Sequence, residues 1–508
     1  MLENIDSKRW SVIRLLILFT AFACIYFLVE RYFKYTVNAD FANSALVWRN
    51  INDYTLSYTL ATWRPTPDSW YLSVYPLHFL LFWITQSDGP GVLIFATAIF
   101  CFMVCYGFAS IVEKTSTRAA FVACVFSIVF MPEIMYTHGF IAHPFAHNST
   151  NAWGAISLLI YILNINYRSY ILTILSAFIC LFTISSDMWF APSFLIPIII
   201  TESLLAYRSR AGFQHALAYM FVFVIGYLHV IQKFLNIEIQ QMAIVSFDEM
   251  ITNFKFLVLL IGQTLNIFFV QNEIAWVASF SLWVALVIYV SVRSIRKMNS
   301  ASYVVLSLTL SILGIASSYI LINNLFKPSS VRYFVNILPC VVAVVLISTT
   351  GILRKAGYLI IGMLIATSLY SYQSGRISDF RKFDDFQKYI TFLDRNNLTY
   401  GYGEFWYNSM EINWVSGGRI LVVPAANDKE HGINAVYARP QTMRFWYDKG
   451  IQSKTPDRQF IAFSKGYVCP DKEECMIKAR KSFGEPDEIL DYNNITLFVY
   501  NHKLKMFR

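Results

Sequence analysis

Charged residues are scarce in this 508-residue sequence: Asp, Glu, Lys and Arg make up 14% of it, whereas 56% is hydrophobic. Ordinary soluble proteins carry about a quarter charged residues. Apolar runs long enough to cross a bilayer recur between residues 11 and 371. This shortage of charge excludes an ordinary soluble protein and predicts a polytopic α-helical membrane protein.

The sequence also lacks the motifs of several enzyme and binding classes. No Gly-rich strand-to-helix turn of the kind needed by a P-loop or a dinucleotide fold is present, and nothing suggests a Ser-His-Asp hydrolase. Although the net charge is +9, the basic residues lie in short loops beside apolar runs, where they report membrane orientation. Nucleic acid is therefore not predicted as a partner, and the lipid bilayer is.

Cysteines are rare outside the apolar runs. Cys469 and Cys475 alone lie in the polar C-terminal part, where they form either two free thiols or, outside the cytosol, a disulfide. The first apolar run is too long for a cleavable signal and lacks a small-residue cleavage site. The other six cysteines fall inside apolar runs and are expected to behave as small hydrophobes: Cys24, Cys101, Cys105, Cys124, Cys180 and Cys340.

The positions of the basic residues predict the membrane topology. Lys8, Arg9 and Arg14 precede or open the first run, which predicts a cytosolic N-terminus and, after an odd number of crossings, an external C-terminus. Counting every apolar run as a span would place several basic clusters outside. We therefore expect about eleven crossings, at 11–33, 91–112, 118–133, 151–165, 169–184, 188–206, 214–235, 274–293, 302–323, 330–349 and 355–371.

Two further apolar runs are interpreted as interfacial segments. The run 71–85 has about fifteen residues, fewer than the roughly twenty that a span needs. The run 254–270 is interrupted by Gly262–Asn266. Because irregular backbone at membrane depth must be covered by protein or face water, we expect this loop to pack over a cavity.

The character of the chain changes near residue 372. Residues 1–371 form the predicted transmembrane domain, whereas residues 372–508 are polar and mixed. Alternating apolar runs at 418–424 and 496–501 predict strands, and the pattern near 383–393 predicts a helix. The second part is therefore a predicted water-exposed α/β domain, large enough for a core of its own.

Asp40 is the first acid after the first apolar run. An acid where a membrane helix emerges into water is a candidate functional residue. The alternative is that Asp40 is the N-cap of the Ala- and Leu-rich helix that follows it. The residues around Asp40 leave both interpretations open.

Three short motifs and the layout of the chain resemble a known family. They are Asp40 with its Ala/Leu-rich helix, the Pro76-Leu77-His78 element with an apolar helix after it, and Arg332-Tyr333 followed by Pro339 at a late span. Together with the C-terminal polar domain, they resemble the GT-C type of membrane glycosyltransferases. That group includes protein O-mannosyltransferases, lipid A aminoarabinose transferases and the serotype-converting glucosyltransferases of bacteriophages.

The resemblance implies an inverting hexosyltransferase in the cell inner membrane. Its donor would be a sugar, glucose being favoured, on a polyprenyl phosphate, and its acceptor a surface glycan such as O-antigen. A companion flippase and a sugar-loading transferase are implied as partners, and no metal or other cofactor. Alternatives are a lipid-linked-sugar transporter or flippase, a glycan polymerase or ligase, or transfer to protein or lipid A.

The resemblance also suggests roles for individual residues. Where the family often has a lysine, this chain has Tyr75, and where it often has an acid after the third span, this chain offers Glu133 and three histidines. The expected catalytic residues are Asp40, as general base, and Asp187. Donor phosphate is expected at Arg332, Lys327, His143 and His147, and the donor or acceptor pocket is expected at His78, Tyr75, His138 and Tyr333.

Each of these residues also has a plainer interpretation. Asp187 is alternatively a turn residue and Arg332 a cation reaching a lipid headgroup. His143 and His147 have a spacing known from metal sites, but Pro144 lies between them and no neighbouring Cys or Asp completes a ligand set. No metal site is therefore predicted. Glu202 is expected to pair with nearby Arg208 or Arg210 rather than to act in catalysis.

Overall fold

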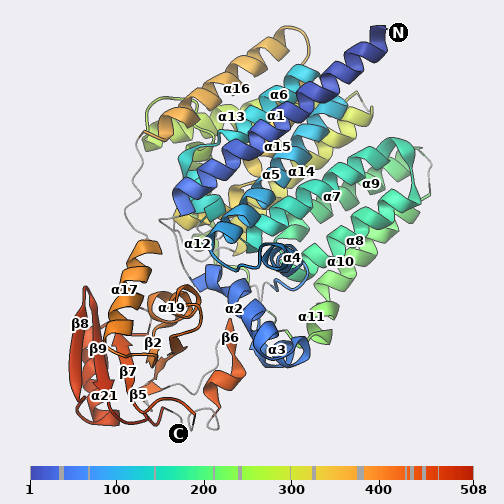
Figure 1. The fold of residues 1–508 in the computed structure, drawn as a ribbon. Helices are drawn as coiled ribbons and strands as arrows, with labels where there is room; N and C mark the ends of the chain where they lie inside the picture. Colours follow the sequence, from blue (N-terminus) through green and yellow to red (C-terminus); the bar gives the residue numbers. More distant parts are fainter. Residues whose placement is uncertain are drawn as a thin grey trace. The chain divides into compact units, whose positions relative to one another are not determined.

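The chain is seen in a computed structural model, in which 72% of the residues are helical and the C-terminal part contains strands (Figure 1). Two compact units are present: unit 1 comprises residues 1–32, 68–77 and 94–376, and unit 2 comprises residues 33–67, 78–93 and 377–508. The structure describes residues 2–33, 39–66, 69–141, 145–209, 212–237, 239, 243–297, 299–322, 328–373, 383–428, 432–434, 440–448, 454–466 and 468–506.

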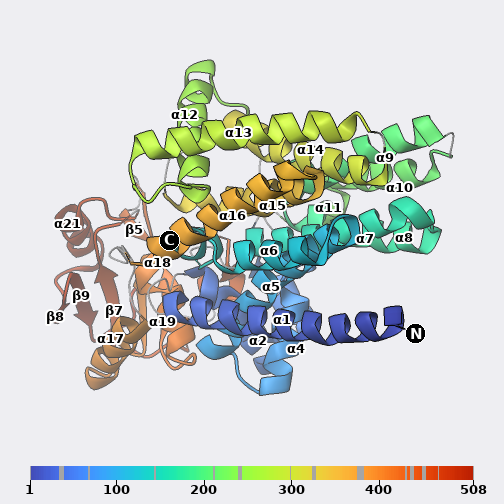
Figure 2. The same cartoon turned by 90° about the horizontal axis from the view of Figure 1, so that it is seen from above.

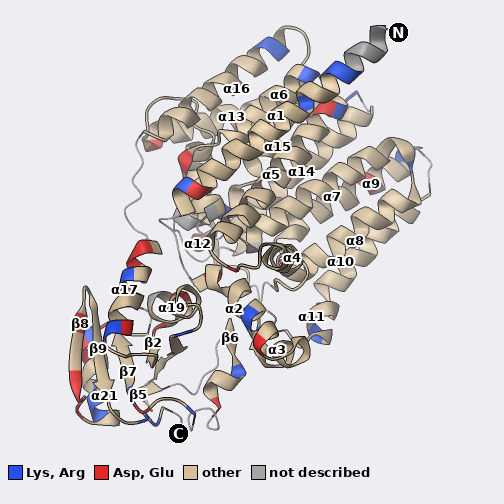
Figure 3. Ribbon diagram, in the orientation of Figure 1, with Lys and Arg blue, Asp and Glu red and all other residues tan. Residues whose placement is uncertain are grey.

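Most helices of the molecule belong to unit 1. Charged residues lie mainly towards the ends of its long helices (Figure 3). In the described part of the chain, six helices are long and apolar enough to cross a membrane, which is compatible with the predicted helical membrane class. They are Lys8–Phe33 within α1 (Leu2–Phe33), α5 (Pro90–Thr115), α13 (Glu273–Ile295), α14 (Ser300–Ile322), Ser330–Ser348 containing α15 (Ile337–Ser348), and α16 (Ile352–Ser371).

The other five predicted crossings correspond to shorter, interrupted or less apolar helices, so the number eleven stays a prediction. The 188–206 segment, for example, divides into the π-helix η2 (Ala191–Leu195) and α9 (Ile196–Ser209). Neighbouring helices pack in pairs, such as α7 with α8 and α13 with α14 (Figure 2). The remaining elements here are α6 (Arg118–Val129), η1 (Met135–Ile141), α7 (Ala146–Tyr167), α8 (Tyr170–Ser186), α10 (Gln214–Tyr227), α11 (Val230–Phe234), α12 (Phe247–Thr264) and η3 (Pro328–Phe334).

The predicted interruption at Gly262 is wrong in its position. Helix α12 continues through Gly262 to Thr264, and the irregular backbone begins after it. Gly262 is needed for packing, because a Cβ there would lie 2.1 Å from the carbonyl oxygen of Trp276 in α13. Asn266, in the irregular stretch, lines a cavity of about 140 Å³ together with Glu133. The expectation that this loop covers a cavity is thus confirmed.

Unit 2 is built around a five-stranded sheet with the order β3-β2-β7-β9-β8. Strand β2 pairs in parallel with β3 and β7, while β9 runs antiparallel to β7 and β8. The predicted strands and helix of this region are confirmed by β3, β9 and α17. The bounds are α17 (Phe383–Arg395), β2 (Tyr400–Gly403), α18 (Phe405–Asn408), α19 (Met410–Val415), β3 (Leu421–Pro424), β7 (Gln459–Phe463), α21 (Lys472–Phe483), β8 (Glu488–Tyr492) and β9 (Ile495–Tyr500).

Segments from the first hundred residues complete unit 2. Helix α2 (Ala39–Asp53) buries its apolar face and packs on α19. After α3 (Leu56–Thr62), the short strand β1 (Trp63–Arg64) pairs with β6 (Thr442–Met443). Helix α4 (Tyr75–Thr85) has only 11 residues, too few to cross a bilayer. This length agrees with the interpretation of the run 71–85 as an interfacial segment. The remaining elements are β4 (Ala426–Asp428), β5 (Gly432–Asn434) and η4 (Arg444–Tyr447).

The two cysteines outside the apolar runs form a disulfide. Cys469 and Cys475 are joined with their Cα atoms 5.9 Å apart, which settles the alternative left open by the sequence. Cys475 lies in α21, and Asn427 donates a hydrogen bond from Nδ2 to its Sγ at 3.4 Å. The bridge therefore fixes the start of α21 close to β4.

Candidate functional site

Asp187 in unit 1 occupies a tight turn directly after helix α8. It is 7% exposed, and its backbone is the extended C-cap of the helix. Its Oδ1 accepts a hydrogen bond from the Trp189 backbone N–H at 2.9 Å, the contact expected for an aspartate in a turn. The turn interpretation of Asp187 therefore holds for one carboxylate oxygen, and the second oxygen remains for other partners.

The second oxygen of Asp187 accepts from two side chains of helix α7. His147 Nδ1 lies 2.8 Å from Oδ2, and Thr150 Oγ1 lies 2.9 Å from the same atom. Positions three apart share a face of a helix, which explains why both side chains reach one carboxylate. Because an ionised carboxylate only accepts hydrogen bonds, His147 carries its proton on Nδ1.

Electrostatics keep the Asp187 carboxylate ionised. Burial acts to raise the pKa of this carboxyl group, since a charge is costly away from water. The positive charge of His147 and the hydrogen bonds from His147, the Trp189 amide and Thr150 outweigh burial, so the pKa lies below its ordinary value. Asp187 thus holds the His147 ring in one orientation, with Nε2 on the side of the ring away from the carboxylate.

Tyr333, in the 3-10 helix η3, packs against the same histidine, with the two rings tilted by 59°. Its ring centroid lies 4.9 Å from that of His147 and 4.8 Å from that of Trp189. Arg332 lies over the Tyr333 ring, with Cζ 4.9 Å from the centroid, and donates from an Nη to the Tyr333 hydroxyl at 3.0 Å. The Nε of Arg332 is buried and has no hydrogen-bond partner among the described residues.

Four residues singled out from the sequence therefore meet in one cluster, which we call the His147 cluster: His147, Asp187, Arg332 and Tyr333. They come from the start of α7, the turn after α8 and η3. Two π-helical turns, η1 and η2, border these segments in the sequence, and such turns are frequent at functional sites. The cluster combines a fixed imidazole with a guanidinium, which is a cationic arrangement suited to an anion.

Asp40 lies in unit 2, in the first turn of α2 rather than before it. The alternative that Asp40 is the N-cap is therefore wrong, although a negative charge in the first turn still favours the helix dipole. The Asp40 Oδ1 accepts a hydrogen bond from Gln441 Nε2 at 2.8 Å. Gln441 precedes β6, and its backbone N–H bonds to the Arg64 carbonyl of β1.

The remaining predicted pocket residues have different surroundings. His78, in unit 2, is fully buried with Nδ1 2.9 Å from Ser44 Oγ, and burial lowers the pKa of its imidazole to about 3. Tyr75, in unit 1, is buried against the ring of Tyr71. His138 lies in η1, with Nδ1 2.9 Å from Thr137 Oγ1. These contacts give His78 and Tyr75 the surroundings of core residues.

Three further expectations concern His143, Lys327 and Glu202, which are not part of the His147 cluster. His143 and Lys327 lie outside the described residues. Glu202 is confirmed as an ion-pair partner, but the partner that the structure shows is Arg168 at 2.6 Å rather than Arg208, and Arg210 lies outside the described residues. Arg168 follows α7 in a left-handed turn and reaches Glu202 in α9. Among the described residues, no group of three His, Cys, Asp or Glu side chains is placed to hold a metal ion.

Several residues of these sites were not found from the sequence. Thr150 stands three positions after His147, and that helical spacing was a usable signal. Two other contacts depend on the fold, and no local pattern marks them. They are the hydrogen bond from Gln441 to Asp40 and the hydrogen bond from the Trp189 backbone to Asp187. In comparisons with known proteins, no family profile matches the chain and no curated protein matches its sequence.

Proposed function

We propose that this chain is an inverting glycosyltransferase of the GT-C type, which moves a hexose from a polyprenyl phosphate to a surface glycan on the outer face of the membrane. Glucose is the favoured sugar and O-antigen the favoured acceptor. The observation that supports this proposal most is the His147 cluster, in which Asp187 orients His147 beside Tyr333, and Tyr333 in turn contacts Arg332. Such a cluster suits the phosphate of a lipid-linked sugar.

In this proposal, His147 and Arg332 hold the departing phosphate. Asp187 bonds to Nδ1 of His147 and leaves Nε2 on the other side of the ring, from which the doubly protonated imidazolium would donate to a phosphate oxygen. The Nε of Arg332 is buried without a partner among the described residues, and a phosphate oxygen would satisfy it. Asp187 touches His147 and not the phosphate, so it acts as a positioning residue.

Asp40 supplies the base of the proposed reaction. Its carboxylate takes the proton of an acceptor hydroxyl, and the oxygen attacks the anomeric carbon of the sugar. The bond from that carbon to the phosphate oxygen breaks, and polyprenyl phosphate leaves with the electron pair. A single displacement without a covalent intermediate inverts the anomeric configuration.

The disulfide between Cys469 and Cys475 supports an extracytoplasmic location for unit 2 in this proposal. Disulfides persist in oxidising compartments and are rare in the cytosol. The few charges along the six apolar helices support a multi-pass membrane protein.

The proposal is tested with purified protein and radiolabelled polyprenyl-phosphate sugars. Arg332→Ala is expected to raise the donor KM at least about tenfold, as the loss of one charge-assisted contact predicts. Arg293→Ala is the matched control, because Arg293 is an exposed arginine at the end of α13. An unchanged KM in Arg332→Ala would contradict the proposed phosphate site.

The same protein in vesicles distinguishes an enzyme from a carrier. A transporter would move the lipid-linked sugar between leaflets without forming a glycosylated product. Transfer of label to a glycan acceptor, with no movement across the bilayer, is the expected result. Movement without transfer would replace the enzyme by a flippase.

A further inference from the structure

Unit 2 contains a pocket of about 870 Å³ that none of the predicted site residues lines. Its size lies in the range of roughly 300–1,000 Å³ that is typical of small-molecule sites. The walls come from the second half of α2, the end of α4 with the turn after it, the end of α19 and η4. All of these segments belong to unit 2.

Aromatic rings form one part of the pocket wall: Trp48, Tyr54, Trp83, Phe445 and Trp446. The rings of Tyr54 and Phe445 lie 5.4 Å apart, and Trp83 is 63% exposed. An exposed tryptophan beside a pocket offers a flat apolar surface that is largely accessible to a ligand. Such faces suit the C–H face of a pyranose ring, which is apolar on one side and carries hydroxyls at its edge.

Polar groups form another part of the wall. Asn50, Asn52, Asp53 and Gln86 line the pocket, and both Asn52 and Asp53 are exposed. The side chains of Asn52 and Asp53 form no hydrogen bond with another residue in the described part of the chain. Amide and carboxylate groups at the rim of an aromatic wall are the acceptors and donors that sugar hydroxyls require.

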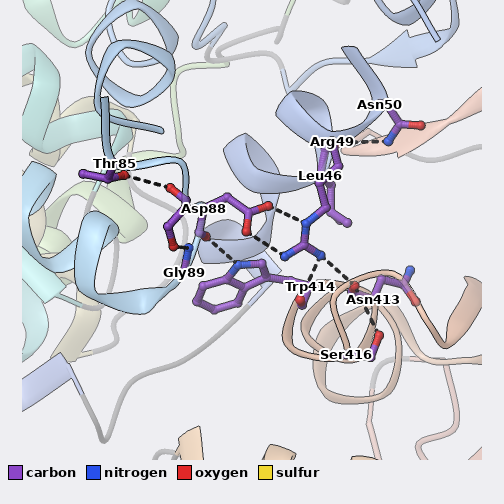
Figure 4. Close-up of polar contacts among 10 residues, drawn as sticks. Leu46, Arg49, Asn50, Thr85, Asp88, Gly89, Asn413, Trp414 and Ser416 are labelled. Carbon is purple, nitrogen blue, oxygen red and sulfur yellow. Dashed lines mark hydrogen bonds and ion pairs between the residues drawn. The ribbon is translucent and has the colours of Figure 1, made fainter. Parts of the chain in front are cut away.

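Arg49 is the one cation among the described lining residues, and its charge is paired with that of Asp88 (Figure 4). Two of its nitrogens bond to both carboxylate oxygens of Asp88, and Nη1 donates to the carbonyls of Trp414 at 2.9 Å and Asn413 at 3.3 Å. Those carbonyls lie at the C-terminal end of α19, where a cation is favoured. Arg49 therefore fixes the wall and is not available to a phosphate.

The turn after α4 is fixed by a further contact. Trp414 donates from Nε1 to the backbone carbonyl of Asp88 at 3.1 Å (Figure 4). Together with the paired Arg49, this bond connects α2, the turn and α19 across the floor of the pocket. A pre-formed wall lowers the ordering cost of binding a ligand.

The charge of the lining decides between ligand classes. Because Arg49 and Asp88 cancel, the unpaired charge among the lining residues is that of Asp53, which disfavours an anion. The amides and the carboxylate disfavour a hydrocarbon tail, which cannot hydrogen-bond them. From the aromatic faces, the polar rim with its one unpaired acid, and the volume, we propose that this pocket binds a neutral saccharide chain. Its role as the acceptor site rests on the proposed transferase function.

Binding is tested on the full-length protein in detergent, without any transfer reaction. The probes are neutral tetrasaccharides of glucose, galactose, mannose and N-acetylglucosamine, each titrated to about 10 mM, a weak-affinity ceiling. Tryptophan fluorescence and saturation-transfer NMR report the binding. At least one of the four probes is expected to saturate the wild-type protein.

Matched variants locate the site of binding. Trp83→Ala is expected to raise the dissociation constant at least tenfold, and Asp53→Asn is expected to raise it severalfold. Ile84→Ala is the control for Trp83, because Ile84 is the next residue on α4 and is 61% exposed but does not line the pocket. Glu473→Gln, an exposed acid of α21, is the control for Asp53. Both controls are expected to change the constant less than twofold.

Three results would overturn the inference. They are the absence of saturation by all four probes, equal effects of Trp83→Ala and Ile84→Ala, and competition by polyprenyl phosphate for the same site. Thermal unfolding of each variant confirms that it is folded. Failure of the transferase assay with intact tetrasaccharide binding would remove the proposed function and leave this inference standing.

Discussion

Gln441 Nε2 donates to the Asp40 carboxylate at 2.8 Å, joining the first turn of α2 to the residue before β6. The two residues are 401 positions apart in the chain. An amide donor fixes a carboxylate without neutralising its charge, unlike an arginine or lysine partner. The hydrogen bond therefore orients the Asp40 carboxylate, as the proposed role of a general base requires.

Asp40→Asn is expected to lower turnover by roughly 10²–10⁴-fold, the usual contribution of a general base. The asparagine side-chain oxygen can still accept from Gln441, so the melting temperature should stay within about 2 °C of wild type. Transfer assays and thermal unfolding measure the two effects separately. Asp457→Asn, at an exposed acid of the same unit, is the control, and full activity in Asp40→Asn would remove Asp40 as the base.

Arg49→Ala is expected to destabilise unit 2 by about 1–3 kcal/mol, because Asp88 and two helix-end carbonyls lose their donor. The side chains of Arg49 and Asp88 are only 22% and 18% exposed. Arg419→Ala, which removes a 63% exposed arginine from Asp394, should cost less than about 1 kcal/mol. Denaturant unfolding followed by tryptophan fluorescence compares the variants. Equal losses of unfolding free energy in Arg49→Ala and Arg419→Ala would contradict the structural role of Arg49.

Acid should weaken the wild-type protein through Asp187. Its folded pKa lies below the ordinary value of 3.8, so the unfolded chain takes up this proton at higher pH than the folded chain does. The stabilisation is complete above the ordinary pKa and is lost as the pH falls through the folded one. Asp187→Asn should therefore be less stable than wild type near neutral pH. The difference in unfolding free energy between the two proteins should narrow towards about pH 3. A difference in unfolding free energy that stays constant with pH would show that Asp187 is not ionised in the folded protein.

Replacing glycine by alanine is expected to have opposite effects on stability at Gly262 and Gly362, because only Gly262 is closely packed. Gly262→Ala should destabilise unit 1, because its Cβ would meet the Trp276 carbonyl at 2.1 Å. Gly362→Ala in α16 meets no atom within 4 Å and should stabilise its helix by up to about 1 kcal/mol. Thermal unfolding in detergent measures both, and a harmless Gly262→Ala would contradict the packing of α12 on α13.

Local patterns predicted the helical membrane class, the strands around Val422 and Phe498, and the helix at Phe386. These features depend on the length and the period of apolar residues, which a sequence displays directly. Patterns also pointed to His147, Asp187, Arg332 and Tyr333, whose side chains the structure brings together.

What the sequence did not reveal depends on contacts between distant segments. The pairing of Glu202 with Arg168 required knowing which helices are neighbours, and sequence distance favoured Arg208 instead. Gly262 looked like a helix break because glycine is a poor helix former, whereas tertiary packing overrides that preference. The pocket of unit 2 was missed because its walls come from segments more than three hundred residues apart.

Unit 2 draws on residues 33–67 and 78–93 as well as on 377–508, so it is discontinuous along the chain. A ribosome releases the early pieces long before the sheet exists, and α2 must wait for α19 and β6 to be synthesised. Its apolar face then needs shelter by a chaperone or by neighbouring helices in the interval. A fragment starting at residue 377 would also lack α2, β1 and the Asp88 turn, so deletion studies should keep the amino-terminal segments or supply them as a second polypeptide.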